Sequence, residues 1–401
     1  MCCNVKKSRI AYLIAGDYFD RKGLVNTVLT KFENLKKKDE FTIDVFFIQI
    51  YWGWLARILK PDRPPKLKRE KYIEIDGYTV NVIWKDFSFL DYFLSVRLGK
   101  APVMERLFIK RVSKKLKGYD LVSTHSLLCS EIALAAKNKY GIPFVASWYG
   151  SDIHSVPFEN AYYKGRTIDV LDNAIHNFMC SKMLWEVSKQ LSTTATRSLL
   201  YNGLRPGFYK YNEAKREEVR QKYNPEGNKI VTFAGGFIEV KNPQQLPEIF
   251  KAVDERYENK VAFWVIGNGK LLPYVEQKLE EYKLNFKKWG YVADEIMPDL
   301  LNCTDVVVLP SRNEGLPLIT VEGLACGANV VGSKVGGIPE AIGIENTVEL
   351  GDSFAEKMSK RIVEMLEVKV IQQLDPCFLW ENISSVESAK YIELLNSKKN
   401  N

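Results

Sequence analysis

The chain has 401 residues, of which 46% are hydrophobic and 26% are charged, with a formal net charge of +8. These are ordinary globular values, and the length favours two or three domains. The seven cysteines are scattered and form no C-x-x-C pair, which argues against a disulfide framework or a zinc site and indicates a reducing compartment.

The positive charge lies in the first half of the chain. Residues 1–200 contain 32 of the Lys and Arg residues and 20 of the Asp and Glu residues, whereas the remainder is slightly acidic. Such a basic half could meet an anionic membrane or an acidic acceptor. Nucleic acid is disfavoured as a partner because no nucleic-acid-binding motif accompanies the charge. No apolar run reaches the roughly 18 residues that span a bilayer, so we expect a cytoplasmic protein.

One tract of this half joins aromatic to basic residues. Trp52 and Trp54 are followed by Lys60 and then by Lys66, Lys68, Arg69 and Lys71. Indoles at headgroup level and lysines over anionic lipid would place the protein peripherally on the inner face of the membrane. A core-packing helix followed by a solvated loop is the equally weighted alternative.

Apolar runs of strand length alternate with helical stretches along the whole chain, which predicts doubly wound α/β sheets. In the first half, strands are predicted at 10–15, 42–48, 79–83, 121–124 and 144–148, with helices at 23–37, 103–116 and 131–139. In the second half, strands are predicted at 230–233, 261–266, 286–289, 306–309 and 329–332. Asn-Gly and Arg-Pro-Gly punctuate 201–210, so we place the hinge there, between a domain at 1–200 and a domain at 201–376.

Two glycine-rich elements follow strands of the second half. Strand 230–233 leads into Gly235-Gly236 and then Lys241, and Asn242 is a good N-cap with Pro243 at the first helical position, so backbone amides could approach phosphate there. Gly267-Asn268-Gly269 follows strand 261–266, and either a ligand role or a simple turn fits it.

The most informative stretch is 311–341, SRNEGLPLITVEGLACGANVVGSKVGGIPEA. Glu314 should lie on the loop at the carboxyl end of strand 306–309, where open α/β sheets hold ligands. Pro317 would begin a helix at 316–326 and Gly327 would end it. The amides of Gly315, Leu316 and Leu318 would then favour an anion, while Glu314 and Glu322 accept hydrogen bonds from sugar hydroxyls.

The blocks VVVLPS, EGLP, ACG and GGIPE, with two Glu eight residues apart, resemble the E-x7-E signature of glycosyltransferase family 4. That family comprises retaining nucleotide-sugar transferases of GT-B fold, which implies two Rossmann-like domains facing each other across a cleft. The resemblance implies that Glu314 contacts the transferred sugar, that Glu322 contacts the donor ribose and that Lys241 neutralises the leaving diphosphate. Glu314 and Lys241 are the predicted catalytic residues. The predicted donor-binding residues are Gly235, Gly236, Gly267, Val292, Gly315, Leu316, Pro317, Leu318 and Glu322.

The first domain matches the family more loosely. A glycine-rich loop after strand one is reduced to Gly16 and Gly23, and the H-G-x-D block reads Tyr149-Gly150-Ser151-Asp152, with a phenol where the family has His. His125 and His154 are further candidates for the acceptor side, whereas His176 lies on a helical pattern and is expected to be structural. The predicted acceptor-side residues are Gly16, Gly23, His125, Tyr149, Gly150 and Asp152.

The chain departs from the family at two more positions. Gly236 stands where an Arg usually clamps the diphosphate, and Arg205 stands where an Asp is usual in the hinge. The segment 377–395 resembles the family's closing helix, which crosses back onto the first domain. No Asp-x-Asp pair is present, so we expect neither a metal nor a cofactor.

The resulting hypothesis is a hexosyl or N-acetylhexosaminyl transfer from a nucleotide-sugar, preferentially a UDP-sugar, to a glycan or polyprenyl-linked acceptor. The setting would be bacterial surface polysaccharide synthesis. A GT-B-fold nucleotide-sugar epimerase and a non-catalytic nucleotide-sugar binder are the alternatives.

Overall fold

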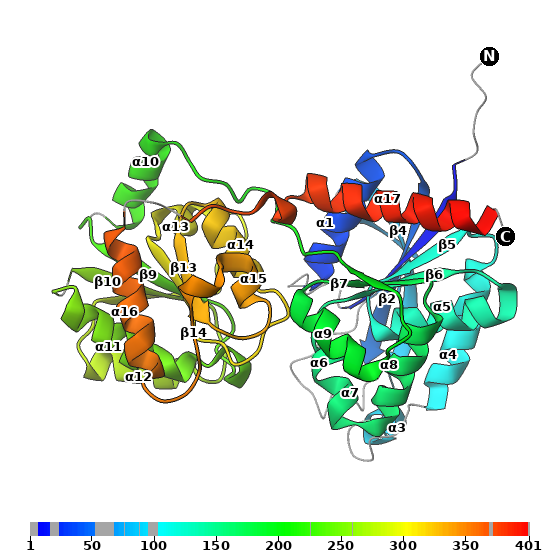
Figure 1. The fold of residues 1–401 in the computed structure, drawn as a ribbon, viewed down its shortest axis with the longest axis horizontal. Coiled ribbons are helices and arrows are strands. Elements are labelled where there is room, and N and C mark those ends of the chain that lie inside the picture. The colour runs from blue at the N-terminus through cyan, green and yellow to red at the C-terminus, as the bar shows by residue number, and fades with distance from the viewer. Residues whose placement is uncertain are drawn as a thin grey trace. The chain divides into compact units, whose positions relative to one another are not determined.

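The computed structural model describes residues 7–16, 24–52, 68–75, 77–87, 89–94, 103–224, 226–258, 260–368 and 372–399. The chain divides into two compact units, Met1–Tyr201 with Trp380–Asn401 and Asn202–Leu379, which we call the first and second domains (Figure 1). The segment that begins at Trp380 therefore belongs to the first domain, although it follows the second in the sequence.

The first domain is built on an eight-stranded sheet of order β3-β4-β2-β1-β5-β6-β7-β8, in which β3 pairs antiparallel with β4 and the other pairs are parallel. Its strands are β1 (Arg9–Gly16), β2 (Thr42–Trp52), β3 (Tyr72–Ile75), β4 (Tyr78–Phe87), β5 (Leu121–Thr124), β6 (Phe144–Trp148), β7 (His176–Met179) and β8 (Arg197–Leu199). The central strands are buried on both faces, which explains their continuous apolar runs.

Helices connect these strands. They are α1 (Leu24–Lys37), α3 (Phe89–Tyr92), α4 (Val103–Ser113), α5 (Leu127–Tyr140), α6 (Ser151–His154), α7 (Val156–Glu159), α8 (Ala161–Asn173), α9 (Lys182–Leu191) and α17 (Trp380–Lys399), with a 3-10 turn η2 (Lys114–Leu116). Helix α5 shows why they begin and end where they do. The Ser126 hydroxyl caps it by accepting from the Cys129 amide, and Gly141 ends it in the left-handed conformation at φ 67°.

Two elements of the first domain differ from the sequence predictions. His176 lies on strand β7, not on a helix, because the short run His176–Met179 is buried between two parallel partners. Tyr51 and Trp52 form the end of β2, so the predicted core-packing helix does not begin there. Trp54, Lys60 and Lys66 lie outside the described residues.

The second domain is built on a six-stranded, wholly parallel sheet of order β11-β10-β9-β12-β13-β14. Its strands are β9 (Lys229–Ala234), β10 (Val261–Ile266), β11 (Phe286–Gly290), β12 (Val306–Leu309), β13 (Asn329–Ser333) and β14 (Thr347–Val348). Its helices are α10 (Glu213–Tyr223), α11 (Leu246–Arg256), α12 (Leu272–Glu281), α13 (Met297–Cys303), α14 (Leu318–Ala325), α15 (Ile338–Ile342) and α16 (Phe354–Glu367), with 3-10 turns η3 (Glu239–Lys241), η4 (Pro243–Gln245), η5 (Ile344–Asn346) and η6 (Pro376–Phe378). This strand order reverses direction between β9 and β12, and such a switch point is where doubly wound sheets bind ligands.

The terminal helix α17 completes the core of the first domain. Trp380, Ile383, Tyr391 and Leu395 are buried in the same apolar cluster as the residues of β1 and α1. Figure 1 shows α17, in red, running beside α1. The first domain therefore depends on a segment that is far away in the sequence.

Candidate active site

The switch point of the second domain brings the two predicted catalytic residues together. Lys241 ends the turn η3 on the loop after β9, and Glu314 lies on the loop after the neighbouring strand β12. The Lys241 ammonium donates to Glu314 Oε1 at 2.6 Å, and the Ser311 hydroxyl donates to the same oxygen at 2.8 Å. The sequence motif did not assign Ser311 a role, although it stands in the same block.

Glu314 is more buried than Lys241, which leaves the Lys241 ammonium accessible to a ligand. Glu314 is only 8% exposed, whereas the Lys241 side chain is 29% exposed. An ammonium has three donors, so Lys241 can hold Glu314 with one and offer others to an incoming anion. The carboxylate is thereby oriented and charge-balanced before any ligand arrives.

The E-x7-E segment is half loop and half helix. Helix α14 begins at Leu318, and Pro317 is the extended N-cap residue at ψ 119°, so the predicted helix at 316–326 starts two residues too early. Gly315 and Leu316 lie on the loop that leads into it. Gly327 ends the helix at φ 84°, as predicted. The first-turn amides of α14 remain a suitable anion site next to Glu314.

Two glycines that sequence reasoning left without a role hold this loop. A Cβ on Gly336, which has φ 56°, would come within 1.8 Å of the Glu314 carbonyl oxygen, and a Cβ on Gly337 within 2.2 Å of the Gly315 carbonyl oxygen. The Gly337 amide also donates to the Glu314 carbonyl at 3.3 Å. The GGIPE block therefore matters because only glycine allows this backbone approach.

The other glycine-rich loops are held in the same way. A Cβ on Gly267 would come within 2.0 Å of the Gly235 carbonyl oxygen, and a Cβ on Gly269 within 2.4 Å of the Phe237 carbonyl oxygen. Packing of the loops after β9 and β10 thus accounts for the G-x-G turn without a ligand. Nothing comparable constrains Gly236, whose nearest neighbour would be the Ile238 side chain at 3.7 Å.

Asn242 differs from its prediction as an N-cap. It adopts the left-handed conformation at φ 52°, and its side chain makes no capping hydrogen bond. Instead, its amide donates to the Pro310 carbonyl at 3.1 Å and its side-chain oxygen accepts from Arg312 Nε at 3.1 Å. Asn242 therefore links the Lys241 loop to the Glu314 loop, which helps to hold the two catalytic candidates in hydrogen-bonding contact.

Glu322 has a partner that the sequence did not reveal. It is buried on α14 and accepts from Arg205 Nε at 2.5 Å, while Arg205 also donates to Asp294 at 2.8 Å. Burial raises the pKa of Glu322, and Arg205 opposes that shift. Burial of Arg205 is outweighed by its bond to Glu322, so the pKa of Arg205 is raised. Asp294 lies two residues after Val292, on the loop after β11. Because Arg205 already donates to Glu322, a ribose bound there would have to share the Glu322 carboxylate with Arg205.

In the first domain, Tyr149 and His125 form a second constellation. Tyr149 follows β6, is partly exposed, and has its hydroxyl 2.7 Å from His125 Nδ1. His125 follows β5 and is wholly buried. It therefore does not itself line the acceptor side, although the sequence predicted that it would. It can act on a ligand only through Tyr149.

The remaining acceptor-side candidates have local roles. Asp152 accepts from the Gly150 amide at 2.9 Å, which shapes the turn into α6. Burial raises the pKa of Asp152, although backbone hydrogen bonds oppose the shift. A Cβ on Gly16 would come within 2.6 Å of Val25, so this glycine lets β1 pass close to α1. Gly23 lies outside the described residues.

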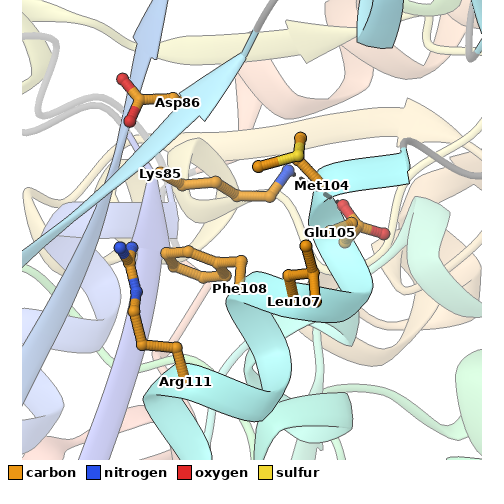
Figure 2. A pocket seen from close by; sticks show the side chains of 7 residues that line it. All are labelled: Lys85, Asp86, Met104, Glu105, Leu107, Phe108 and Arg111. Carbon is orange, nitrogen blue, oxygen red and sulfur yellow. Dashed lines mark ion pairs between the residues drawn. The ribbon is translucent and has the colours of Figure 1, made fainter.

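A further hollow of about 130 Å³ lies between β4 and α4 in the first domain (Figure 2). Lys85 at its wall pairs with Glu105 at 2.9 Å, and Glu105 pairs with Arg166 at 2.8 Å, so these charges are already satisfied. The outer rim carries Met104 and Leu107, which are 54% and 60% exposed. This rim is a surface feature and not a second catalytic centre.

Within the described ranges, no three His, Cys, Asp or Glu side chains are grouped so that they could hold a metal ion. Over the same residues, no helix has the length and hydropathy needed to cross a membrane.

Residues 215–373, which contain Lys241, Glu314 and Glu322, match the family model "Glycosyl transferases group 1". The matched segment includes every strand of the parallel sheet and both loops at the switch point, so the similarity to this family lies in the second domain.

Similar proteins match the chain over more than the length of the second domain. The chain is 25% identical over 249 residues to a Bacillus subtilis protein named as a teichuronic acid biosynthesis glycosyltransferase, covering 61% of this chain and 60% of the relative. It is 22% identical to the N-acetyl-alpha-D-glucosaminyl L-malate synthase of Bacillus anthracis, covering 78% of this chain and 82% of the relative. The chain spans about three fifths of the length of the first curated relatives that it matches.

Among solved structures, the chain resembles Anabaena HepE in complex with UDP and glucose, with a TM-score of 0.63, 16% identity and 98% of each chain covered. This likeness over nearly the whole chain shows the fold. The protein has the GT-B fold, with two Rossmann-like domains, as the sequence predicted.

Proposed function

We propose that this protein is a retaining, metal-independent glycosyltransferase of family 4. It moves a hexosyl or N-acetylhexosaminyl unit from a nucleotide-sugar, preferentially a UDP-sugar, to a glycan or polyprenyl-linked acceptor. Bacterial surface polysaccharide synthesis, on the cytoplasmic side of the membrane, is the proposed setting. The glycosyltransferase relatives support the reaction class, and the structural neighbour with UDP and glucose supports the donor class.

The observation that carries the proposal is the contact between Lys241 and Glu314 at the switch point. The donor phosphates would accept from Lys241 and from the first-turn amides of α14, which stabilises the charge that develops on the leaving diphosphate. Glu314, already oriented by Lys241 and Ser311, would accept from a hydroxyl of the transferred sugar. Glu322 would reach the ribose while it remains bound to Arg205.

Retention follows from a same-face displacement. The acceptor oxygen forms its bond to the anomeric carbon on the face from which the diphosphate departs, and the bond from that carbon to the phosphate oxygen breaks. The acceptor proton passes to the departing phosphate oxygen. No protein nucleophile takes part, so no covalent glycosyl-enzyme intermediate forms.

The reaction can be tested with a panel of UDP-, GDP- and ADP-sugars, scored for nucleotide release with and without lipid-linked acceptors. We expect release that depends on the acceptor and does not change when EDTA is added. Conversion of the sugar nucleotide without an acceptor would favour the epimerase. Tight nucleotide-sugar binding without turnover on any acceptor would favour a non-catalytic binder.

Two surfaces of the first domain could contact an anionic membrane: the basic tract around Arg69, and the exposed face of α4 and η2. In the described part of the basic tract, Arg69 pairs with Asp86 and lies 4.0 Å from the Tyr51 ring centroid, so this residue already has protein partners. The exposed face of α4 and η2 joins Met104 and Leu107 to a run of cations, Arg106, Lys110, Arg111, Lys114 and Lys115. Apolar side chains beside lysines match an anionic bilayer, to which each cation contributes about 1 kcal/mol.

Vesicle sedimentation separates these surfaces. Wild type should pellet with anionic liposomes and stay in solution with neutral ones at low salt. Replacing Arg106, Lys110 and Lys114 by Ser should release it if α4 is the contact, and replacing Lys66, Lys68, Arg69 and Lys71 by Ser should release it if the basic tract is. If wild type ignores anionic vesicles, the membrane proposal is wrong, and soluble acceptors are the next to test.

A further inference from the structure

A chain of hydrogen-bonding groups crosses the core of the first domain and ends at Tyr149. Its successive distances are 2.7 Å from Tyr149 OH to His125 Nδ1, 3.1 Å from His125 Nε2 to Ser123 Oγ, 2.7 Å from Ser123 Oγ to Tyr391 OH and 2.6 Å from Tyr391 OH to Glu387 Oε1. We call these five residues the buried chain. They come from β5, from the loops after β5 and β6, and from the terminal helix α17.

The buried chain is closed to solvent except at one end. Ser123, His125, Tyr391 and Glu387 are all fully buried, whereas Tyr149 keeps partial exposure. Lys31 of α1 is also buried and places its ammonium 3.6 Å from Glu387 Oε1. A buried acid and a buried base thus stand at the Glu387 end of the chain, and the Lys31 ammonium also lies 5.9 Å from the Tyr149 ring centroid.

The ionisation of Glu387 follows from its neighbours. Burial raises the pKa of Glu387 and lowers the pKa of Lys31, and the attraction between the two charges opposes both shifts. A proton on Glu387 Oε2 would lack an acceptor, because that oxygen has no hydrogen-bond partner among the described residues. A proton on Oε1 would leave the buried Lys31 ammonium, 3.6 Å away, without a counter-charge. The arrangement therefore favours a carboxylate paired with Lys31.

Proton counting then gives the chain one direction. An ionised carboxylate can only accept, so Tyr391 donates to Glu387, and Ser123 in turn donates to Tyr391. Burial lowers the pKa of His125 well below its usual range, and the nearby Lys31 lowers it further. The neutral ring has a single proton, which lies on Nε2 toward Ser123. Tyr149 must therefore donate its proton to His125 Nδ1.

We propose that Glu387 sets the direction of this buried chain and so presents the Tyr149 oxygen to the substrate as a hydrogen-bond acceptor. The partner it selects is a donor group, such as a sugar hydroxyl, and not an ionised phosphate oxygen, which has no proton to give. This inference rests on the proposed function and on the sequence prediction that Tyr149 is an acceptor-side residue. Glu387, Tyr391 and Ser123 are positioning residues that act through His125.

The direction can be measured without turnover. The chain has three histidines, so ¹⁵N-histidine NMR resolves the His125 ring nitrogens. We expect His125 in wild type to be the Nε2–H tautomer with Nδ1 unprotonated. In Glu387→Gln the side chain can donate as well as accept, so a substantial fraction of His125 should shift to the Nδ1–H tautomer. The matched control is Glu381→Gln, an exposed substitution on the same helix, which should leave His125 unchanged.

Tyr391→Phe gives a second, milder break because it removes only the hydroxyl that joins Ser123 to Glu387. It should also mix the His125 tautomers, which keeps the test available if Glu387→Gln does not fold. An Nδ1–H tautomer in wild type, or a single unchanged tautomer in both variants, overturns the proposal.

Activity supplies the link to the substrate. Tyr149→Phe, Tyr391→Phe and Glu387→Gln should each lower kcat/KM about tenfold while leaving the nucleotide Kd unchanged, since one hydrogen bond to the acceptor side is lost. The expected tautomers together with no transfer on any acceptor would refute the proposed function but keep the direction of the chain. Wild-type turnover in all three variants would instead refute the role of Tyr149 while transfer itself stands.

Discussion

The two domains build their ligand loops by different means. In the second domain, Lys241 and Glu314 meet because glycines and Asn242 force the backbones of adjacent loops together. In the first domain, Tyr149 is fixed by side chains that reach it through the core, the most distant from helix α17. Close backbone contacts require Gly and Pro at fixed positions, which appear in the sequence as short motifs. Buried side-chain contacts join residues that are far apart in the sequence and form no motif. The sequence therefore shows what holds the second-domain loops, whereas in the first domain it shows Tyr149 and His125 as candidates but not the contacts from α17 that fix them.

The strongest break on the second-domain side is Glu314→Gln. The amide keeps an oxygen for Lys241 and Ser311, so the loop should hold its shape. The lost charge-assisted bond to the sugar should lower kcat about 100-fold, equivalent to about 3 kcal/mol. Nucleotide affinity should stay within a few-fold in calorimetric titration. Wild-type turnover in this variant would remove Glu314 from the site.

Gly336→Ala tests the backbone device itself. Its φ of 56° and the 1.8 Å approach to the Glu314 carbonyl mean that even a methyl group must displace the loop. We expect unfolding to need about 2 kcal/mol less, seen as a fall of several degrees in Tm, with loss of activity.

The matched control is Gly165→Ala in the first domain. A Cβ there meets nothing within 4 Å inside α8. This change should stabilise the protein by about 0.5–1 kcal/mol. Equal effects from the two substitutions would show that the Gly336 contact is not needed.

Lys241→Ala separates phosphate binding from base binding. Its ammonium is assigned to the diphosphate, so affinity for a nucleoside diphosphate should fall about tenfold, and affinity for the bare nucleoside should not change. Equal losses for both ligands would place Lys241 outside the phosphate site.

The smallest expected effect is the contribution of His176 to the pH dependence of first-domain stability. Burial, with a contribution from Lys390, lowers the pKa of His176 to about 4. The unfolded chain takes up a proton near pH 6.5 and the folded chain does not, so stability falls as the pH drops from about 6.5 toward 4. At pH 5.5 this amounts to about 1 kcal/mol.

His176→Gln keeps a hydrogen-bonding group opposite Ser198, whose hydroxyl lies 2.7 Å from His176 Nε2 in wild type. Denaturant unfolding of the variant should show a shallower loss of stability between pH 6.5 and 5. Parallel curves for wild type and variant would mean that His176 has the same pKa in the folded and unfolded chain.

The predictability of the fold follows the same division. Strands such as β6, β10 and β12 were predicted with the bounds observed because they are buried and consist mainly of apolar residues. The four strands missed, β3 (YIEI), β7 (HNFM), β8 (RSL) and β14 (TV), lack such a run, and pairing with neighbours decides their conformation more than composition does.

The candidate sites show where sequence reasoning ends. Local turn residues predicted the loop of Glu314, but Asn242 and Pro317 adopt conformations set by tertiary contacts. Arg205 was visible as a departure from the family, yet its contact with Glu322 joins residues 117 positions apart, and nothing local signals it.

The place of α17 in the first-domain core also constrains how the protein is made. The helix Trp380–Lys399 emerges from the ribosome after the entire second domain, and until then Lys31 has no carboxylate and Ser123 has no Tyr391. The first domain therefore cannot complete its core until the second domain has been synthesised. We expect the second domain to fold first, and a chain truncated before residue 380 should leave the first domain incompletely folded and bound by chaperones.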